Sequence, residues 1–112
     1  MIDSYAFGHV TIDGTSYRSD VIIYPDRVDS SWWRQQGHNL CLDDIREVLS
    51  SKPEVLVLGK GQPGLMDVPE SVRKEIEAQG VTLYVAATQN AVKKYNEIHS
   101  QKKTVAALHL TC

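Results

Sequence analysis

Val55-Leu56-Val57-Leu58 leads directly into Gly59-Lys60-Gly61-Gln62-Pro63-Gly64, and this stretch decides the fold. An unbroken run of aliphatic residues is typical of a strand that is buried on both faces, as in a parallel sheet covered by helices. The glycines after it predict a tight turn with positive φ angles. The stretch therefore predicts an α/β domain with a glycine-rich loop at the carboxyl end of a central strand.

Patterns on either side of this strand extend the prediction. Apolar residues at helical spacing predict helices over 43–51, 69–80 and 88–100, and short apolar runs predict strands over 21–24, 81–86 and 103–111. Pro69 is placed to open the second helix and Gly80 to end it, and Thr88 is a suitable N-cap for the third. A strand–helix–strand unit of this kind gives parallel neighbours in one sheet.

The amino-terminal part has a different pattern. Tyr5 to Ile12 alternates as a strand, Asp13-Gly14 predicts a two-residue turn, and Thr15 to Arg18 returns as the hairpin partner. Residues 25–40 form a long polar loop for so small a domain. Together the patterns predict an α/β fold in three layers, with a mixed central sheet, helices on its faces and the N-terminal β-hairpin packed at one side.

Length and charge limit the class of protein. The 112 residues suffice for one domain over residues 1–112. The net charge of −2 argues against a nucleic-acid-binding protein, and no apolar run is long enough for a membrane helix. The start of the sequence lacks the features of a secretory signal or a transit peptide, which favours the cytoplasm. We expect a monomer, because no long apolar stripe is left after the core is filled.

The cysteines and histidines indicate no metal site. Cys41 and Cys112 lack the spacing of a zinc or redox motif, and His9, His99 and His109 have no metal-ligand spacing. Free thiols and a Cys41–Cys112 disulfide both remain open.

The loop over residues 59–64 fits the G-x-G-x-x-G pattern after a strand, which by itself indicates a dinucleotide site. Three features argue against that site. The next helix begins only at Pro69, Pro63 removes a backbone N–H from a phosphate cradle, and Ala86-Ala87-Thr88 offers no carboxylate for a ribose. Two readings therefore remain, a glycine turn and a ligand-binding loop, and no cofactor is predicted.

The carboxyl ends of the predicted parallel strands place a candidate small-molecule or anion site at the edge that carries this loop. Open α/β sheets bind ligands at that edge. The N-termini of the helices that begin near Pro69 and Thr88 would direct backbone N–H groups to it, and Lys60 adds positive charge. The ligand-binding candidates are Gly59, Lys60, Gly61, Gly64, Thr88, Gln89 and Asn90.

A second set of candidates, for a partner or a pocket, comes from the long loop and the third helix. Trp33, Arg34 and His38 combine aromatic, cationic and titratable groups, although loop tryptophans also cover core edges. Tyr95 and Asn96 are expected to do structural work on the third helix and complete this set. No nucleophile motif occurs, so the sequence assigns no catalytic residue.

Several stretches together resemble one family, the Mth-type domain proteins. These stretches are Arg18-Ser19-Asp20-Val21-Ile22, Trp33-Arg34 with Gly37-His38, Val57-Leu58-Gly59-Lys60-Gly61, Ala91 with Tyr95-Asn96, and Thr104-Val105-Ala106-Ala107-Leu108. The family includes an adipogenesis-associated protein of vertebrates and a mitochondrial complex I assembly factor. The resemblance implies a three-layer β+α/β/α fold with a mixed sheet, and no established activity or cofactor. Family members usually have a small residue or Thr where this chain has Lys60.

Two functions from different classes follow from these patterns. The lack of a catalytic constellation and the Trp32-Trp33 dipeptide, which we expect to be exposed, favour a non-enzymatic interaction or assembly module with an unknown protein partner. The alternative is a protein that binds a small molecule or anion at the loops Gly59–Gly64 and Thr88–Asn90, or a weak enzyme that works there. The sequence identifies neither the partner, nor the ligand, nor a reaction.

Overall fold

The computed structural model describes residues 1–111. In chain order its elements are β1 (Ile2–Ala6), β2 (His9–Ile12), β3 (Thr15–Tyr17), β4 (Val21–Ile23), β5 (Val28–Asp29), a 3₁₀ turn (Leu42–Ile45), α1 (Arg46–Ser50), β6 (Val55–Lys60), α2 (Glu70–Ala78), β7 (Thr82–Ala86), α3 (Thr88–Ile98) and β8 (Thr104–His109). The elements expected from the sequence pattern are present, with differences at some of their ends.

A five-stranded sheet in the order β5-β4-β8-β6-β7 forms the middle of the molecule. Strand β6 pairs in parallel with both neighbours, so that Val57 lies opposite Tyr84 on one side and Ala106 on the other. Strand β4 runs antiparallel to β8, which makes the sheet mixed. Residues 55–58 are almost fully buried, as predicted for a strand that is covered on both faces.

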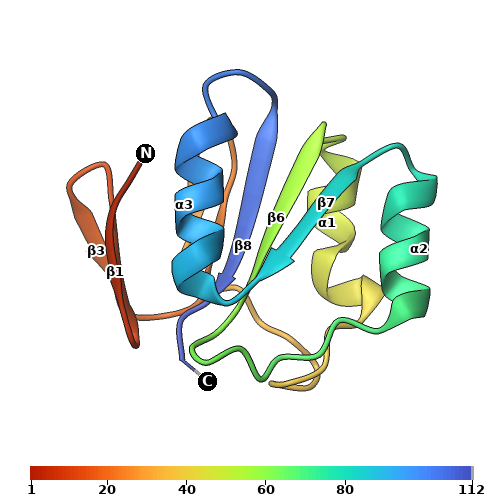
Figure 1. Cartoon of the computed structure of the whole chain (residues 1–112), viewed down its shortest axis with the longest axis horizontal. Helices are drawn as coiled ribbons and strands as arrows, with labels where there is room; N and C mark the ends of the chain where they lie inside the picture. The colour runs from red at the N-terminus through yellow and green to blue at the C-terminus, as the bar shows by residue number, and fades with distance from the viewer. Residues whose placement is uncertain (112) are drawn as a thin grey trace.

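Alternate side chains of the strands enter two separate cores. One core lies between the sheet and helices α1 and α2, and includes Leu56 and Ile76. The other lies between the sheet and a layer made of α3 and the small sheet β1-β2-β3, and includes Val57, Ile12 and Tyr95. Figure 1 shows α3 in front of the large sheet with the small sheet beside it. The three-layer prediction is therefore confirmed.

The amino-terminal sheet has one strand more than the predicted hairpin. Residues 5–12, predicted as a single strand, are divided by a turn at Phe7-Gly8, where Gly8 has a φ of 78°. Side chains alternate with a period of two along a strand, so a turn of two residues leaves the apolar–polar alternation unchanged from one strand to the next. The pattern alone therefore does not reveal this turn. The predicted turn at Asp13-Gly14 and its return strand are confirmed.

The start of α3 also differs from the prediction. Thr88 is the first residue of the helix, and Ala87 occupies the N-cap position. The Thr88 hydroxyl donates to the carbonyl oxygen of His109. It makes no capping bond within its own helix, because Thr88 is buried against the neighbouring strand and loop, where tertiary partners replace the cap.

Other features of the fold bear on the predictions. The helix predicted over 43–51 is a 3₁₀ turn followed by the short helix α1. Cys41 is half-buried, and its pairing with Cys112 falls outside the described residues. Within residues 1–111, no helix is both long enough and apolar enough to cross a membrane.

Candidate functional site

The glycine-rich loop folds back on the start of α3 and the end of β8. Gly61 donates its N–H to Thr88 Oγ1 at 2.8 Å, and its carbonyl accepts the N–H of Thr88 at 3.0 Å. Thr88 Oγ1 in turn donates to the carbonyl of His109 at 2.6 Å. A Cβ atom at position 59 would lie 2.8 Å from this hydroxyl oxygen. Thr88 therefore joins loop, helix and strand, and their close approach requires Gly59.

The first backbone N–H groups of this loop are used within the protein. Gly61 donates to Thr88, Gln62 donates to the carbonyl of Thr111 at 3.0 Å, and Pro63 has no N–H. An anion cradle needs several such groups free and directed at the ligand. In this conformation the loop is a structural turn.

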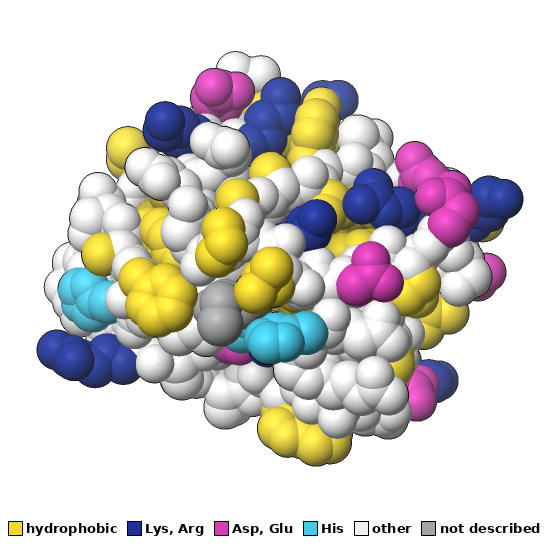
Figure 2. Space-filling view, turned by 60° about the horizontal axis from the view of Figure 1, so that its bottom comes forward, with side chains coloured by type: hydrophobic (Ala, Val, Ile, Leu, Met, Phe, Trp, Pro, Cys, Tyr) yellow, Lys and Arg dark blue, Asp and Glu magenta, His cyan; other side chains and the backbone are white. Residues whose placement is uncertain are grey.

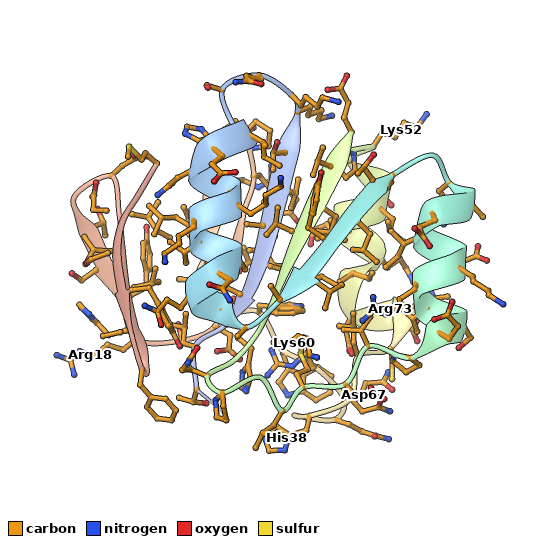
Figure 3. All side chains as sticks on the ribbon, viewed as in Figure 1. Arg18, His38, Lys52, Lys60, Asp67 and Arg73 are labelled. Atoms are coloured by element: carbon orange, nitrogen blue, oxygen red, sulfur yellow. The ribbon has the colours of Figure 1, made fainter. Side chains whose placement is uncertain are left out.

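The remaining loop candidates lie nearer the surface. Lys60 is half-buried and lies opposite His109 in the pairing of β6 with β8. Figure 3 places Lys60 at the same end of the molecule as His38 and Asp67. A Cβ at Gly64 would lie 3.7 Å from Ala87, just before α3. Gln89 and Asn90 are exposed in the first turn of α3.

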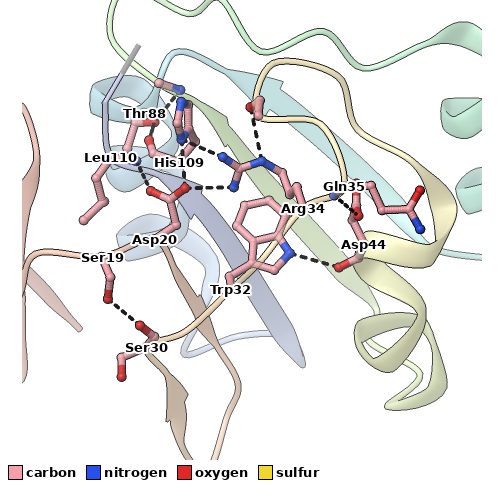
Figure 4. Close-up of polar contacts among 12 residues, drawn as sticks. Ser19, Asp20, Ser30, Trp32, Arg34, Gln35, Asp44, Thr88, His109 and Leu110 are labelled. Atoms are coloured by element: carbon pink, nitrogen blue, oxygen red, sulfur yellow. Dashed lines mark hydrogen bonds and ion pairs between the residues drawn. The ribbon is translucent and has the colours of Figure 1, made fainter.

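A buried ionic group, here called the Asp20 cluster, lies at this edge and consists of Asp20, Arg34 and His109 (Figure 4). Asp20 Oδ2 lies 2.9 Å from both Arg34 Nη1 and His109 Nδ1, and Oδ1 accepts the N–H of Leu110 at 2.8 Å. Arg34 Nη2 is also 2.9 Å from His109 Nδ1. A protonated Nδ1 donates to Asp20 and an unprotonated one accepts from Arg34, so this atom has a partner in either tautomer.

The environment of Asp20 favours its charged form. Burial alone would raise the pKa of this carboxyl group, because desolvation disfavours an anion. Hydrogen bonds from His109, from the Leu110 N–H and from Arg34, together with the Arg34 charge, outweigh burial and lower the pKa below its ordinary value of 3.8. At neutral pH Asp20 is therefore ionised and balances the buried guanidinium.

The loop over residues 31–40 contains one buried and one exposed tryptophan. Trp32 is 7% exposed, its Nε1–H donates to the carbonyl of Asp44 at 2.9 Å, and the Arg34 guanidinium lies 4.6 Å from its ring. Trp33 is 73% exposed. The expectation that both are exposed is wrong for Trp32, because Asp44 and the buried Arg34 hold its ring inside.

This loop is also joined to the segment that follows the glycine-rich loop. Leu40 N–H donates to the carbonyl of Asp67 at 2.8 Å, and Asp67 N–H donates to the carbonyl of His38 at 2.7 Å. The His38 ring lies 6.0 Å from the ring of His109, in an edge-to-face arrangement. The structure therefore brings Arg34 and His38 together at the end of β8.

Tyr95 and Asn96 do not belong to this group. Asn96 Oδ1 accepts the N–H of Ile2 at 2.9 Å, and Asn96 Nδ2 donates to the carbonyl of Ile2 at 2.8 Å. Tyr95 is buried in the second core and stacks on His99, with ring centroids 5.0 Å apart. Both residues fasten α3 to the small sheet or to the core, in agreement with the structural work predicted for them.

Two members of the cluster were missed by sequence reasoning. Asp20 precedes β4 and His109 ends β8. In the sequence, Asp20 stands out only as part of a stretch that resembles the family, and His109 only as a histidine without metal-ligand spacing. The only available signal was Arg34, since a buried guanidinium requires a carboxylate partner. No pattern in the sequence indicates that Arg34 is buried.

Three buried polar atoms near this edge have no hydrogen-bond partner among residues 1–111, namely His109 Nε2, Gln62 Oε1 and Arg34 Nη1. Arg34 Nη1 is nevertheless ion-paired with Asp20, so His109 Nε2 and Gln62 Oε1 are the two that lack any polar contact with the described residues. When Nδ1 carries the ring proton, Nε2 is a free proton acceptor. Among the described residues, no three His, Cys, Asp or Glu side chains are grouped to hold a metal ion. Two pockets, of about 560 and 270 Å³, are lined by other parts of the molecule.

Known proteins share this architecture. Residues 2–110 match the model of a family described as "Protein of unknown function (DUF498/DUF598)". A conserved hypothetical protein from Pyrococcus horikoshii has a similar crystal structure, with a TM-score of 0.87 and 26% identity over 100% of this chain and 99% of that one. The protein MT938 gives a TM-score of 0.85 and 27% identity over 100% and 98% of the two chains.

A more distant match concerns the fold alone. A Mth938-like domain from Bordetella pertussis gives a TM-score of 0.69 and 21% identity, covering 98% of this chain and 85% of that one. The resemblance to the Mth-type domain proteins and its implied fold are thereby confirmed. The family description names no activity. The chain belongs to the DUF498/DUF598 family of proteins of unknown function.

Proposed function

We propose that this protein is a non-enzymatic interaction module whose contact surface is centred on Trp33. The observation that carries the proposal is the 73% exposure of Trp33 between Trp32 and Arg34, which are both buried and anchored. A large aromatic side chain on a fixed backbone binds a partner with little loss of conformational freedom. Tryptophan is also enriched among the residues that dominate protein–protein binding energies.

Two further exposed apolar side chains support this surface. Phe7 is 60% exposed and Leu65 is 57% exposed. We call Phe7, Trp33 and Leu65 the exposed trio. Each lies close in sequence to a residue that hydrogen-bonds to the segment 109–111 at the end of β8, and these residues are Gly8, Arg34 and Gln62 respectively. Figure 2 shows this end, where several hydrophobic side chains reach the surface among charged side chains, histidines and white backbone and other groups. A mixture of this kind is typical of the surface of a module that binds a protein reversibly.

The proposal includes the finer predictions from the sequence. The protein is monomeric by itself, works in the cytoplasm and acquires its function through one protein partner. Size-exclusion chromatography of the purified chain tests the first of these, since a dimer would elute at twice the mass.

Partner capture with matched variants tests the interaction surface. The double substitution Trp33→Ala/Leu65→Ala removes two members of the exposed trio and no buried group, so the fold is retained. Quantitative pull-down from the native host is expected to lose the specific partner by about tenfold or more. The purified partner then shows the same loss of affinity in calorimetry.

Tyr84→Ala is the matched control. Tyr84 is also an exposed aromatic residue, but it lies in the middle of β7, opposite Val57 of β6, and is not part of the exposed trio. The control is expected to keep the partner. An unchanged partner set for the double variant would contradict the proposed surface.

A second candidate function rests on the unpartnered His109 Nε2 and Gln62 Oε1. The two atoms belong to neighbouring segments, because Gln62 N–H donates to the carbonyl of Thr111, two residues after His109. His109 Nδ1 lies 2.9 Å from Asp20 Oδ2, and a proton on Nδ1 leaves Nε2 as a proton acceptor. This arrangement supports a small-molecule site or a weak enzyme at the same edge. NMR titration with phosphate, nucleotides and small carboxylates tests it. Shifts over 59–64 and 88–90 would support it, and their absence would reject it.

A further inference from the structure

A pocket of about 560 Å³ opens at the end of the molecule opposite to the Asp20 cluster. Its walls come from the β2–β3 turn, the segment from β4 to β5, the last turn of α3 and the start of β8. Thr104, which lines it, begins β8, whereas His109 ends the same strand. The volume is within the range of about 300–1,000 Å³ that is usual for small-molecule sites.

The inner wall of this pocket is apolar and aromatic. Ile12, Ile23 and Val28 supply aliphatic surface, and Tyr95 stacks on His99 with the ring planes 10° apart. Tyr95 is only 4% exposed, and burial, with a smaller effect from the charge of Asp13, raises the pKa of its phenol, so the group stays protonated and can donate a hydrogen bond. Tyr24, another residue of the lining, has a buried hydroxyl with no hydrogen-bond partner among residues 1–111.

The rim of the pocket carries more positive than negative side chains. Arg27, Lys102 and Lys103 line it together with Asp13 and Asp26. Asp26 is paired with Arg27 at 3.1 Å. Lys102 forms no ion pair with a described carboxylate. An anionic ligand would therefore find a cation at the mouth of a cavity whose inner wall is apolar and whose rim is polar.

We propose that this pocket binds a small organic anion, with its apolar part against Ile12, Ile23 and Tyr95 and its carboxylate or phosphate at Lys102. The lining has polar and apolar surface in about equal shares, so the pocket offers both an apolar contact and polar groups that fix the orientation of a ligand. This proposal does not depend on the interaction surface at the other end, and either can fail without the other.

NMR titration with small probes tests the ligand class. Phenyl phosphate and benzoate each join an apolar ring to one of the two anionic groups, whereas inorganic phosphate lacks the ring and benzyl alcohol lacks the charge. We expect saturable shifts at Ile12, Ile23 and Thr104 with at least one ring-bearing anion below about 10 mM. The preferred anion tells phosphate from carboxylate. No saturable shifts, or equal binding of inorganic phosphate or of benzyl alcohol, would overturn the proposal.

Two variants test the assigned contacts. Lys102→Ala is expected to weaken binding of the preferred probe by about fivefold or more, because a charge-assisted contact is lost. Lys93→Ala, an exposed lysine of α3 outside the pocket, should leave binding unchanged. Tyr95→Phe removes only the hydroxyl and should also weaken binding. Unchanged affinity in both Lys102→Ala and Tyr95→Phe would overturn the assignment.

Discussion

The two ends of β8 differ in how they are packed. The carboxyl end, here called the closed end, is filled by hydrogen-bonded side chains, and the amino end, here called the open end, borders a pocket. At the carboxyl end, Thr88 and the Asp20 cluster fill the edge where open α/β sheets usually bind ligands. At the amino end, the turn of the small sheet and the end of α3 leave a cavity between them. The difference shows that the usual ligand edge of this fold class is occupied by the protein's own side chains, and that open volume is found where the extra N-terminal sheet meets the core.

The substitution Asp20→Asn should have the largest effect at the closed end. It removes the anion that faces Arg34 and His109 in a buried setting, and unfolding free energy should fall by about 3–5 kcal/mol. Urea unfolding followed by circular dichroism measures the loss. Lys102→Ala at the open end is the control and should stay within about 0.5 kcal/mol of the parent. A loss below about 1 kcal/mol for Asp20→Asn would mean that the cluster behaves as an ordinary surface pair.

Gly59→Ala should have the next largest effect at the closed end. A Cβ there would lie 2.8 Å from Thr88 Oγ1 and 3.0 Å from Leu108 Cδ2, so the hydrogen-bonded contact between the glycine-rich loop and Thr88 of α3 must shift. We expect a loss of about 1–3 kcal/mol in unfolding free energy. Gly37→Ala is the control, because a Cβ there meets nothing within 4 Å. Equal stability of the two variants would show that the closed end is loosely packed.

Acid should destabilise the closed end gradually. The pKa of Asp20 is lowered in the folded state, so its contribution is fully present above the ordinary value of 3.8 and is lost as the pH falls through the lower folded value. The unfolding free energy, measured in urea at a series of pH values from neutral down to this acidic range, should therefore fall as the pH is lowered. The unfolding free energy of the Asp20→Asn variant should fall less steeply over the same range. Identical slopes would mean that other carboxyl groups control acid unfolding.

Much of the fold was predictable because it follows local patterns. The run at residues 55–58 and the helical spacing around it define layers and neighbours, and the Asp13-Gly14 turn is a local signal. The division of residues 5–12 was not predictable, since a turn of two residues preserves the period.

The site was less predictable, because burial of a polar residue is a tertiary property. Arg34 and Thr88 were selected for their chemistry, but Asp20 comes from a position 14 residues before Arg34 and His109 from one 75 residues after it. Nor could the sequence tell Trp32 from Trp33, since the difference depends on the carbonyl of Asp44 and on the position of Arg34.

The paired hydrogen bonds between Asn96 and Ile2 have a consequence for how this fold can diversify. One amide side chain attaches β1 to α3 through backbone atoms, and a backbone partner does not depend on which residue supplies it. The exposed positions of the small sheet can therefore be exchanged without loss of this attachment. A chain with this architecture can accept substitutions on the outer surface of its N-terminal sheet while the structure of the helix and of the large sheet is unchanged.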